Sequence, residues 1–232
     1  MKPVAVFRHS SGEGPGYFAT FLEARSIPWT LVRIDEGEAP PPAPDDFSGL
    51  CFMGGPMSVN DDLPWLPPTF ALIRAAAERG IPVIGHCLGG QLMSKALGGT
   101  VTKNRVKELG WGEVETTDPA AADWLGDKTK FEAFHWHGET FSIPPGATRI
   151  LKSAYCDNQA FALGSHLGMQ CHVEMTEAMI RLWCRAWDEE KAAPAPSVQT
   201  PAQMNERIDE RITAMRAAAD RLYTKWIAGL KK

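Results

Sequence analysis

The chain has 232 residues, of which 44% are hydrophobic and 22% charged, and its formal net charge is −4. This is the composition of a globular protein with enough apolar residues for a sizeable core. The negative charge argues against nucleic acid as a partner, and no apolar run is long enough to span a membrane. We therefore expect one large α/β domain, or one domain with an appended element.

Strands and helices alternate in the first half of the sequence. Short apolar runs predict strands over 4–7, 29–34, 49–53 and 81–84. Helical patterns cover 16–25, 68–79 and 89–97, and the proline-rich segment 40–44 predicts a stiff loop. This order predicts a mostly parallel central sheet with helices on both faces, in which ligands bind at the carboxyl ends of the strands.

The second half changes to short strands and turns from Gly110 onward. Strands are predicted over 111–116, 130–135, 150–153, 160–163 and 167–172, which indicates a small antiparallel flap and a return to the main sheet. A helix is predicted over 177–188, and 192–201 is rich in proline and alanine. We divide the chain into a domain over 1–190, a linker over 191–200 and a C-terminal amphipathic helix over 201–232.

The expected C-terminal helix carries an apolar seam at spacings of four and three. Its members are Ile208, Ile212, Met215, Ala219, Leu222 and Trp226. We expect this seam to pack on the chain's own domain, because so short a coiled coil is marginal by itself. The alternative is a contact with a second copy, as in a homodimer, or with another partner.

The cysteines and the N-terminus indicate the compartment. The sequence enters a predicted strand within its first residues, so we expect no signal peptide. The five cysteines are odd in number and show no Cys-x-x-Cys spacing: they are Cys51, Cys87, Cys156, Cys171 and Cys184. This pattern predicts a reduced, cytoplasmic protein without a disulfide framework or a zinc knuckle.

The segment 85–89 reads Gly-His-Cys-Leu-Gly and lies between a predicted strand and a predicted helix. This is the pattern of a nucleophile elbow, with cysteine in place of serine. The glycines permit a tight turn, and the helix N-terminus favours a thiolate on Cys87. A cysteine near such a turn can also be a plain core residue, but here strand, glycines and helix agree.

Two further segments complete a candidate cysteine site. His172 and Glu174 are two residues apart, so on an extended chain they point the same way, and a carboxylate can orient an imidazole that takes the thiol proton. Gly54 and Gly55 end a predicted strand, and backbone N–H groups there could form an oxyanion hole with that of Leu88. Each signal is weak alone, and together they are specific.

Other features have less specific interpretations. His135 and His137 could share a strand face as metal ligands, but no third ligand stands at a suitable spacing, so we expect no metal site. Strand alternation should turn His86 away from Cys87, toward the core. The glycine-rich loop 12–16 lacks a phosphate-binding pattern and is expected either to line a pocket or to form a plain turn.

With these segments the chain resembles a known family, the class I glutamine amidotransferases with their Cys-His-Glu triad. It is most similar to the glutaminase part of GMP synthase. The resemblance spans about residues 45–188 and is carried by the motifs at 54–58, 85–91, 137–139 and 170–174. The family commonly has Phe and Pro where this chain has Cys171 and Val173, and Asp where it has Glu139. The first two changes alter packing and loop stiffness rather than chemistry.

The resemblance implies a role for each matching residue. It makes Cys87 the nucleophile, His172 the base and Glu174 its orienting partner. It assigns the oxyanion hole to the N–H groups of Gly55 and Leu88, and substrate binding to Gly54, Gln91, His137 and Gly138. It implies no cofactor and no metal.

Three functions remain open from the sequence. The first is a glutaminase that passes ammonia to a synthetase on another chain, since no ATP-binding domain follows here. The second is a stand-alone hydrolase of γ-glutamyl compounds through the same thioester. The third is a non-catalytic binding module, which the intact Cys87, His172 and Glu174 disfavour.

Overall fold

The computed structural model describes residues 1–187 and 195–231. The strands are β1 (Val4–Arg8), β2 (Trp29–Arg33), β3 (Gly49–Phe52), β4 (Val83–His86), β5 (Val101–Thr116), β6 (Lys130–Phe141), β7 (Thr148–Ser153), β8 (Ala160–Leu163) and β9 (His166–Met169). The helices are α1 (Gly16–Glu23), α2 (Leu66–Glu78), α3 (Leu88–Ala96), α4 (Ala122–Leu125), α5 (Glu177–Arg185), α6 (Pro201–Asn205) and α7 (Ile208–Ile227). Short 3₁₀ turns cover Ile34–Glu36 and Pro119–Ala121.

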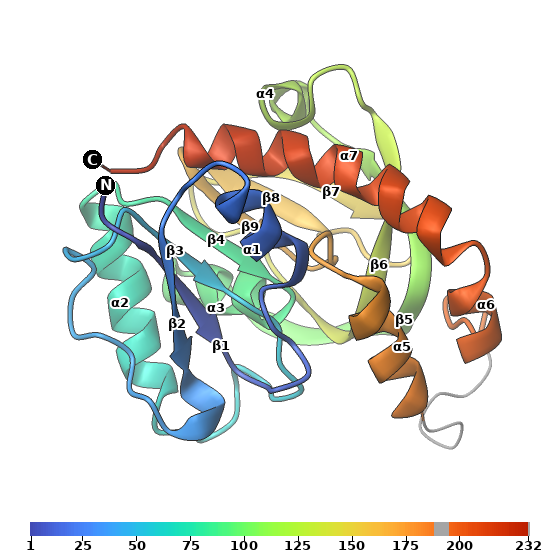
Figure 1. Ribbon diagram of the computed structural model, residues 1–232, viewed down its shortest axis with the longest axis horizontal. Coiled ribbons are helices and arrows are strands. Elements are labelled where there is room, and N and C mark those ends of the chain that lie inside the picture. Colours follow the sequence, from blue (N-terminus) through green and yellow to red (C-terminus); the bar gives the residue numbers. More distant parts are fainter. Residues whose placement is uncertain (188–194, 232) are drawn as a thin grey trace.

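Within the described residues the strands form one nine-stranded sheet, in the order β2-β1-β3-β4-β9-β8-β7-β5-β6 (Figure 1). The strands from β2 to β9 in this order pair in parallel. From β9 onward the pairing is antiparallel, and β5 with β6 forms its longest ladder. We call these the parallel part and the antiparallel part. The predicted α/β class, with a mostly parallel sheet and an antiparallel flap, is confirmed.

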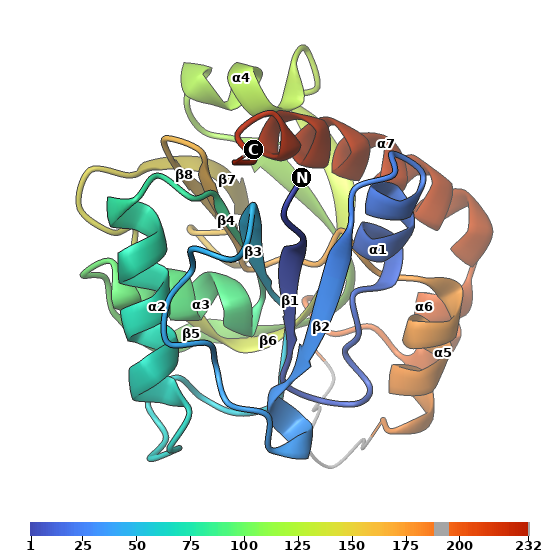
Figure 2. The ribbon, with the colours of Figure 1, turned by 60° about the vertical axis from the view of Figure 1, so that its left-hand side comes forward.

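Each face of the parallel part is buried under its own set of helices, which explains why its inner strands β1, β3 and β4 are mostly apolar. Ala5 and Phe7 of β1 belong to the core under α2 and α3, whereas Val4 and Val6 belong to the core under α1, α5 and α7. Figure 2 shows α2 and α3 on one side of β1 and β3, and α1 and α7 on the other. The prediction of helices on both faces is therefore confirmed.

The helix α7 packs across both parts of the sheet. It contacts α1 on one side and β6 and α4 on the other. The rings of Tyr223 and Trp226 are fully buried and meet Phe18 edge-on at centroid distances of 4.9 and 5.6 Å. All the predicted seam residues are buried in this core, so the seam packs on the chain's own domain. No helix of the described residues has both the length and the apolar character needed to cross a membrane.

The C-terminal region differs in detail from the expected linker and single helix. Residues 188–194 lie outside the described residues. They include positions 191–194 of the predicted linker and position 188, the end of the predicted helix 177–188. The segment 195–200 lies along β5, where the Leu109 N–H donates to the Ser197 carbonyl at 2.9 Å and the Gln199 N–H donates to the Leu109 carbonyl at 2.9 Å. Arg207, at a φ of +52°, separates α6 from α7, so the expected helix is two helices.

The antiparallel strands β5 and β6 are also longer than predicted. β5 begins at Val101 rather than at 111, and β6 continues to Phe141 rather than ending at 135. The added part of β5 is mostly exposed and polar, so it shows no apolar alternation that sequence reasoning could use. It is fixed instead by its pairing with β6, with an irregularity between Lys103 and Glu108.

Candidate active site

Cys87 stands at the predicted elbow between β4 and α3, with a φ of +52° that few non-glycine residues adopt. The flanking glycines are required sterically. A Cβ on Gly85 would lie 2.4 Å from the backbone of Gly89, and a Cβ on Gly89 would lie 2.0 Å from the carbonyl oxygen of Phe52. The Cys87 N–H donates to the Met169 carbonyl at 2.8 Å, which ties the turn to the end of β9.

His172 and Glu174 follow β9 and form a buried pair. His172 Nδ1 donates to Glu174 Oε1 at 2.6 Å, and each residue is 1% exposed. Backbone bonds hold the histidine to β6, since its N–H donates to the Phe134 carbonyl at 2.8 Å and its carbonyl accepts from the Phe134 N–H at 3.1 Å. The other carboxylate oxygen of Glu174 accepts from the Val173 N–H at 2.9 Å. The structure therefore fixes the orientation of this imidazole.

The charges around this pair favour its ionised form. Burial disfavours a charged imidazole, but the negative charges of Glu174 and Cys87 outweigh it and raise the pKa of His172 well above its ordinary value. Burial likewise disfavours the carboxylate, but His172 and His86 outweigh it and lower the pKa of Glu174 to about 2. Cys87 thus lies close enough to His172 to act on its charge.

The glycines predicted for the oxyanion hole lie beside the elbow. A Cβ on Gly55 would fall 2.8 Å from Cδ2 of Leu88, so these two residues are in direct contact. Leu88 is the first residue of α3, where an N–H has no partner within the helix. Gly55 and Cys87 line the same cavity, and the N–H of Leu88 lies at the positive end of the α3 dipole.

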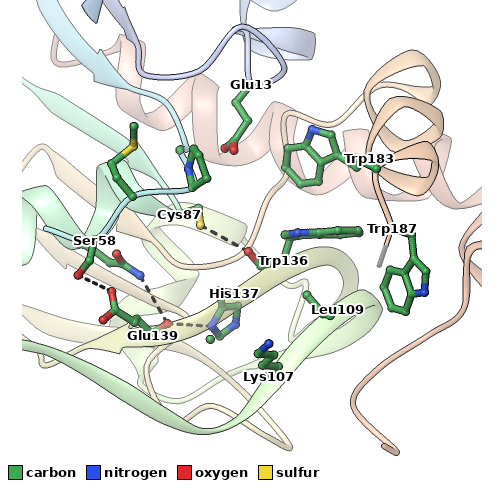
Figure 3. A pocket seen from close by; sticks show the side chains of 16 residues that line it. Glu13, Ser58, Cys87, Lys107, Leu109, Trp136, His137, Glu139, Trp183 and Trp187 are labelled. Carbon is green, nitrogen blue, oxygen red and sulfur yellow. Dashed lines mark hydrogen bonds between the residues drawn. The ribbon is translucent and has the colours of Figure 1, made fainter. Parts of the chain in front are cut away.

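A cavity of about 570 Å³ opens above Cys87 (Figure 3). Five residues from the predicted site line it: Gly55, Cys87, Gln91, His137 and Gly138. The other four, Gly54, Leu88, His172 and Glu174, are not part of its lining. The volume lies within the range of small-molecule sites, and glutamine alone would leave much of it unfilled.

One wall of the cavity is cross-linked by hydrogen bonds between the turn after β3 and the end of β6. Ser58 Oγ donates to Glu139 Oε2 at 2.8 Å, and His137 Nδ1 donates to the Glu139 carbonyl at 2.9 Å. Gln91 Nε2 donates to Gln170 Oε1 at 3.1 Å. We call this side, formed by Ser58, Gln91, His137 and Glu139, the polar wall.

Several residues at the cavity were not predicted as site residues. Gln170 Nε2 donates to Cys87 Sγ at 3.6 Å. From the sequence, Gln170 was only the first residue of the motif at 170–174 and had no predicted role. Glu13 lines the cavity, so of the two interpretations of loop 12–16 the pocket-lining one is confirmed. Trp136, Trp183 and Trp187 also line it, and no motif of the sequence marks them as site residues.

The two histidines considered as metal ligands have a third neighbour that the sequence did not reveal. Glu108 pairs with His137 across β5 and β6, and among the described residues one ligand atom each from Glu108, His135 and His137 lies within 4.8 Å of the others. The oxygens of Glu108 accept from Ser153 Oγ at 2.7 Å and from Gln159 Nε2 at 2.8 Å, and one lies 3.0 Å from His137 Nε2. We interpret this cluster as a buried polar network around the carboxylate of Glu108.

His86 is fully buried, as expected, and supports the pair from behind. Its Nε2 lies 3.0 Å from the Tyr223 hydroxyl and 3.9 Å from Glu174 Oε2. Tyr223 belongs to α7, so the C-terminal helix reaches the vicinity of the carboxylate through a single imidazole.

A mostly parallel α/β sheet, with a cysteine on a strand-to-helix elbow and a buried histidine–glutamate pair beside it, is the architecture of thiol-dependent acyl-transfer proteins. Comparison with known proteins narrows this class. Residues 19–179 match the family model described as glutamine amidotransferase class-I. The chain therefore belongs to the class I glutamine amidotransferase family, as its motifs predicted.

Individual relatives agree with this assignment. The glutamine amidotransferase-like protein YfeJ of Salmonella typhimurium is 32% identical over 179 residues, which cover 72% of this chain and 74% of the relative. The crystal structure of a glutamine amido transferase from Methylobacillus flagellatus has a TM-score of 0.96 at 46% identity, covering 100% of this chain and 96% of the other. GMP synthase of Lactobacillus gasseri is 36% identical over 132 residues, which are 55% of this chain but only 24% of that enzyme.

Proposed function

We propose that the protein hydrolyses the side-chain amide of glutamine through a thioester on Cys87. The observation that carries this proposal is the buried His172–Glu174 pair, held at 2.6 Å next to a cysteine that faces the cavity. Membership of a glutamine amidotransferase family implies glutamine hydrolysis in general, and the assignment to these three residues is ours.

In the first step the Cys87 thiolate attacks the amide carbon and forms the C–S bond. Negative charge then develops on the former carbonyl oxygen, which would accept hydrogen bonds from the N–H groups of Gly55 and Leu88. His172 gives its proton to the departing nitrogen as the C–N bond breaks, and ammonia leaves. A water molecule, deprotonated by His172, releases glutamate from the thioester.

The neighbours of the pair suit these roles. Glu174 occupies Nδ1 of His172, which leaves Nε2 for proton exchange, and Nε2 makes no well-formed hydrogen bond within the described part of the chain. The Gln170 amide, 3.6 Å from the sulfur, adds a donor that stabilises negative charge there. We assign the glutamyl part of the substrate to the polar wall, with Gln91, His137 and Gly138 in contact with it and Gly54 shaping the turn beneath.

The fate of the ammonia gives two versions of this function. The similarity to the glutaminase part of GMP synthase supports transfer to a synthetase subunit on another chain. A stand-alone hydrolase of γ-glutamyl compounds is supported by the cavity, which extends beyond the polar wall to three tryptophans.

The purified protein, incubated with glutamine and with γ-glutamyl amides, tests the proposal by the glutamate and amine released. We expect release of glutamate without added cofactor. Repetition with cell extract shows whether a partner accelerates the reaction, as transfer to a synthetase requires. A protein that releases no glutamate from any of these compounds, with or without extract, contradicts the proposal.

A further inference from the structure

Glu13 brings a carboxyl group to the reacting end of the cavity, in the loop between β1 and α1 (Figure 3). A Cβ placed on Gly54 would lie 2.0 Å from Oε2 of Glu13 and 3.3 Å from Cε1 of His172. The carboxyl group therefore lies against the same small residue as the imidazole. A leaving group that departs from the reacting carbon on this side would meet it.

Among the residues that the structure describes, the positively charged neighbour of this carboxyl group is the imidazole of His172, which Glu174 already pairs. No hydrogen bond or ion pair engages the Glu13 side chain there, and its charged neighbours are His172 and Glu174. Burial raises the pKa of Glu13 to about 7, with the charge of His172 opposing the rise and that of Glu174 adding to it. Because no group in the described part of the chain pairs with this carboxyl, a positively charged ligand would favour its charged form.

Three tryptophans continue the wall next to Glu13. Trp183 Nε1 donates to the Gly12 carbonyl at 3.0 Å, which fixes the indole beside the loop. Trp136 packs edge-on against Trp183 and Trp187, at centroid distances of 5.4 and 5.8 Å. Indole faces attract ammonium groups, as in the aromatic cages that bind quaternary ammonium ligands. We call Glu13 and these three residues the aromatic–acid wall.

The two walls lie on different sides of Cys87. In Figure 3, Ser58 and Glu139 stand on one side of the sulfur, and Trp183 and Trp187 stand on the other, with Glu13 above. A γ-glutamyl amide has its glutamyl part on one side of the reacting carbon and its leaving amine on the other. With the glutamyl part on the polar wall, the leaving amine extends along the aromatic–acid wall.

We propose that the substrate is a γ-glutamyl amide whose leaving amine carries a second, positively charged amino group, as in an alkyl diamine or polyamine. Glu13 and the tryptophans bind that distal ammonium. This inference rests on the proposed function, because it uses the same thioester chemistry.

The reaction remains a hydrolysis in which atoms balance. The C–N bond to the diamine breaks as the C–S bond to Cys87 forms, and the departing nitrogen takes the proton of His172. Water then cleaves the thioester, so the products are glutamate and the free diamine. No oxidant, reductant or second substrate is needed.

A matched pair of substrates tests the inference on the full-length protein. The mono-γ-glutamyl amide of 1,4-diaminobutane and γ-glutamyl butylamide have the same chain, and only the first ends in an ammonium. We expect kcat/KM to be about tenfold or more higher for the first. In Glu13→Gln this advantage disappears, while hydrolysis of the butylamide and of glutamine changes little. The matched control is Glu139→Gln on the polar wall, which should lower all three alike.

The alternatives give different results. Equal kcat/KM for the two amides in the wild type overturns the inference, and so does an equal loss for all three substrates in Glu13→Gln, which would place Glu13 on the α-ammonium of the glutamyl part. If none of the three substrates is hydrolysed, the proposed function is contradicted instead. Calorimetric binding of 1,4-diaminobutane against butylamine then tests the wall without catalysis, and equal affinity refutes it. The same measurement serves if Glu13→Gln does not fold.

Discussion

The parallel and antiparallel parts of the sheet contribute to the cavity in different ways. The parallel part supplies Cys87 through a turn between consecutive elements, β4 and α3, whose glycines let it pack against the neighbouring strands. The antiparallel part supplies the end of β6. Its residues are placed by strand pairing between positions far apart in the sequence, such as Glu108 and His137. The reactive group is thus built locally, and the surface that selects the substrate is built by long-range contacts. Changes in the first part should abolish reaction, and changes in the second should alter selection or stability.

The largest effect is expected at the elbow in the parallel part. Cys87→Ala should lower kcat by about 10⁴-fold or more, because the thioester cannot form, while the melting temperature stays close to that of the wild type. A glutamine-mimicking electrophile should modify Cys87, as shown by peptide mapping. Cys51→Ala, in the neighbouring strand, serves as the control and should remain active. Modification mainly at Cys51 or Cys171 would move the nucleophile elsewhere.

The next effect concerns the junction of the two parts, where β9 ends. His172→Asn should be nearly as damaging as loss of the cysteine, and Glu174→Gln should cost about two orders of magnitude less, because the orienting acid of such a unit matters least. Steady-state glutamate release measures both. Near-normal turnover in His172→Asn would be incompatible with our assignment and would make His137 the next candidate base.

The third prediction concerns α7, which packs on both parts. Trp226→Ala should reduce the free energy of unfolding by about 3–5 kcal/mol, because a fully buried ring leaves a cavity. Urea denaturation measures it. Truncation at about Ala195 should be more severe, since it exposes the whole core face of α7. A truncated protein with an unchanged melting temperature and a halved mass in light scattering would show that the helix is an interface instead.

The fourth prediction uses the raised pKa of Glu13. The pKa of Glu13 is about 7 in the folded state and about 4.5 in the unfolded chain, so the folded state holds this proton more firmly. The contribution of protonated Glu13 to the free energy of unfolding is therefore complete below pH 4.5 and is lost as the pH rises through 7. Glu13→Gln should therefore be more stable than the wild type by about 1–3 kcal/mol at pH 8, and equal to it near pH 4. Thermal melts across this range decide. A variant less stable than the wild type at pH 8 contradicts the pKa argument.

The smallest effect is expected from metal removal. The cluster of Glu108, His135 and His137 lies entirely in the antiparallel part, and its acid already has hydrogen-bond donors. Chelator treatment should leave the rates of glutamine and γ-glutamyl hydrolysis unchanged. A large loss that zinc restores would instead show that these three residues bind a functional ion.

The sequence predicted what depends on local geometry. The elbow at Cys87 and the facing of His172 and Glu174 follow from the spacing of a few residues, and both are found in the structure. Glu108 was missed because its partner His137 comes from the next strand, and no spacing along the chain encodes that register. The break at Arg207 was missed because the predicted seam begins only at Ile208 and does not report a single left-handed residue before it.

The early exposed part of β5 was missed for a related reason. Its side chains face solvent, so their polarity carries no period, and only the hydrogen bonds to β6 make it a strand. The tryptophans and Glu13 belong to three separate segments, and their meeting in one cavity is a property of the folded chain alone.

The contact between Tyr223 and His86 connects the last helix to the buried pair. The Tyr223 hydroxyl lies 3.0 Å from His86 Nε2, and His86 lies 3.9 Å from the carboxylate of Glu174. Local opening of α7 would therefore uncover His86 and bring water towards Glu174. The helix acts as a cover for the pair, so its local stability limits how often water reaches the carboxylate from this side.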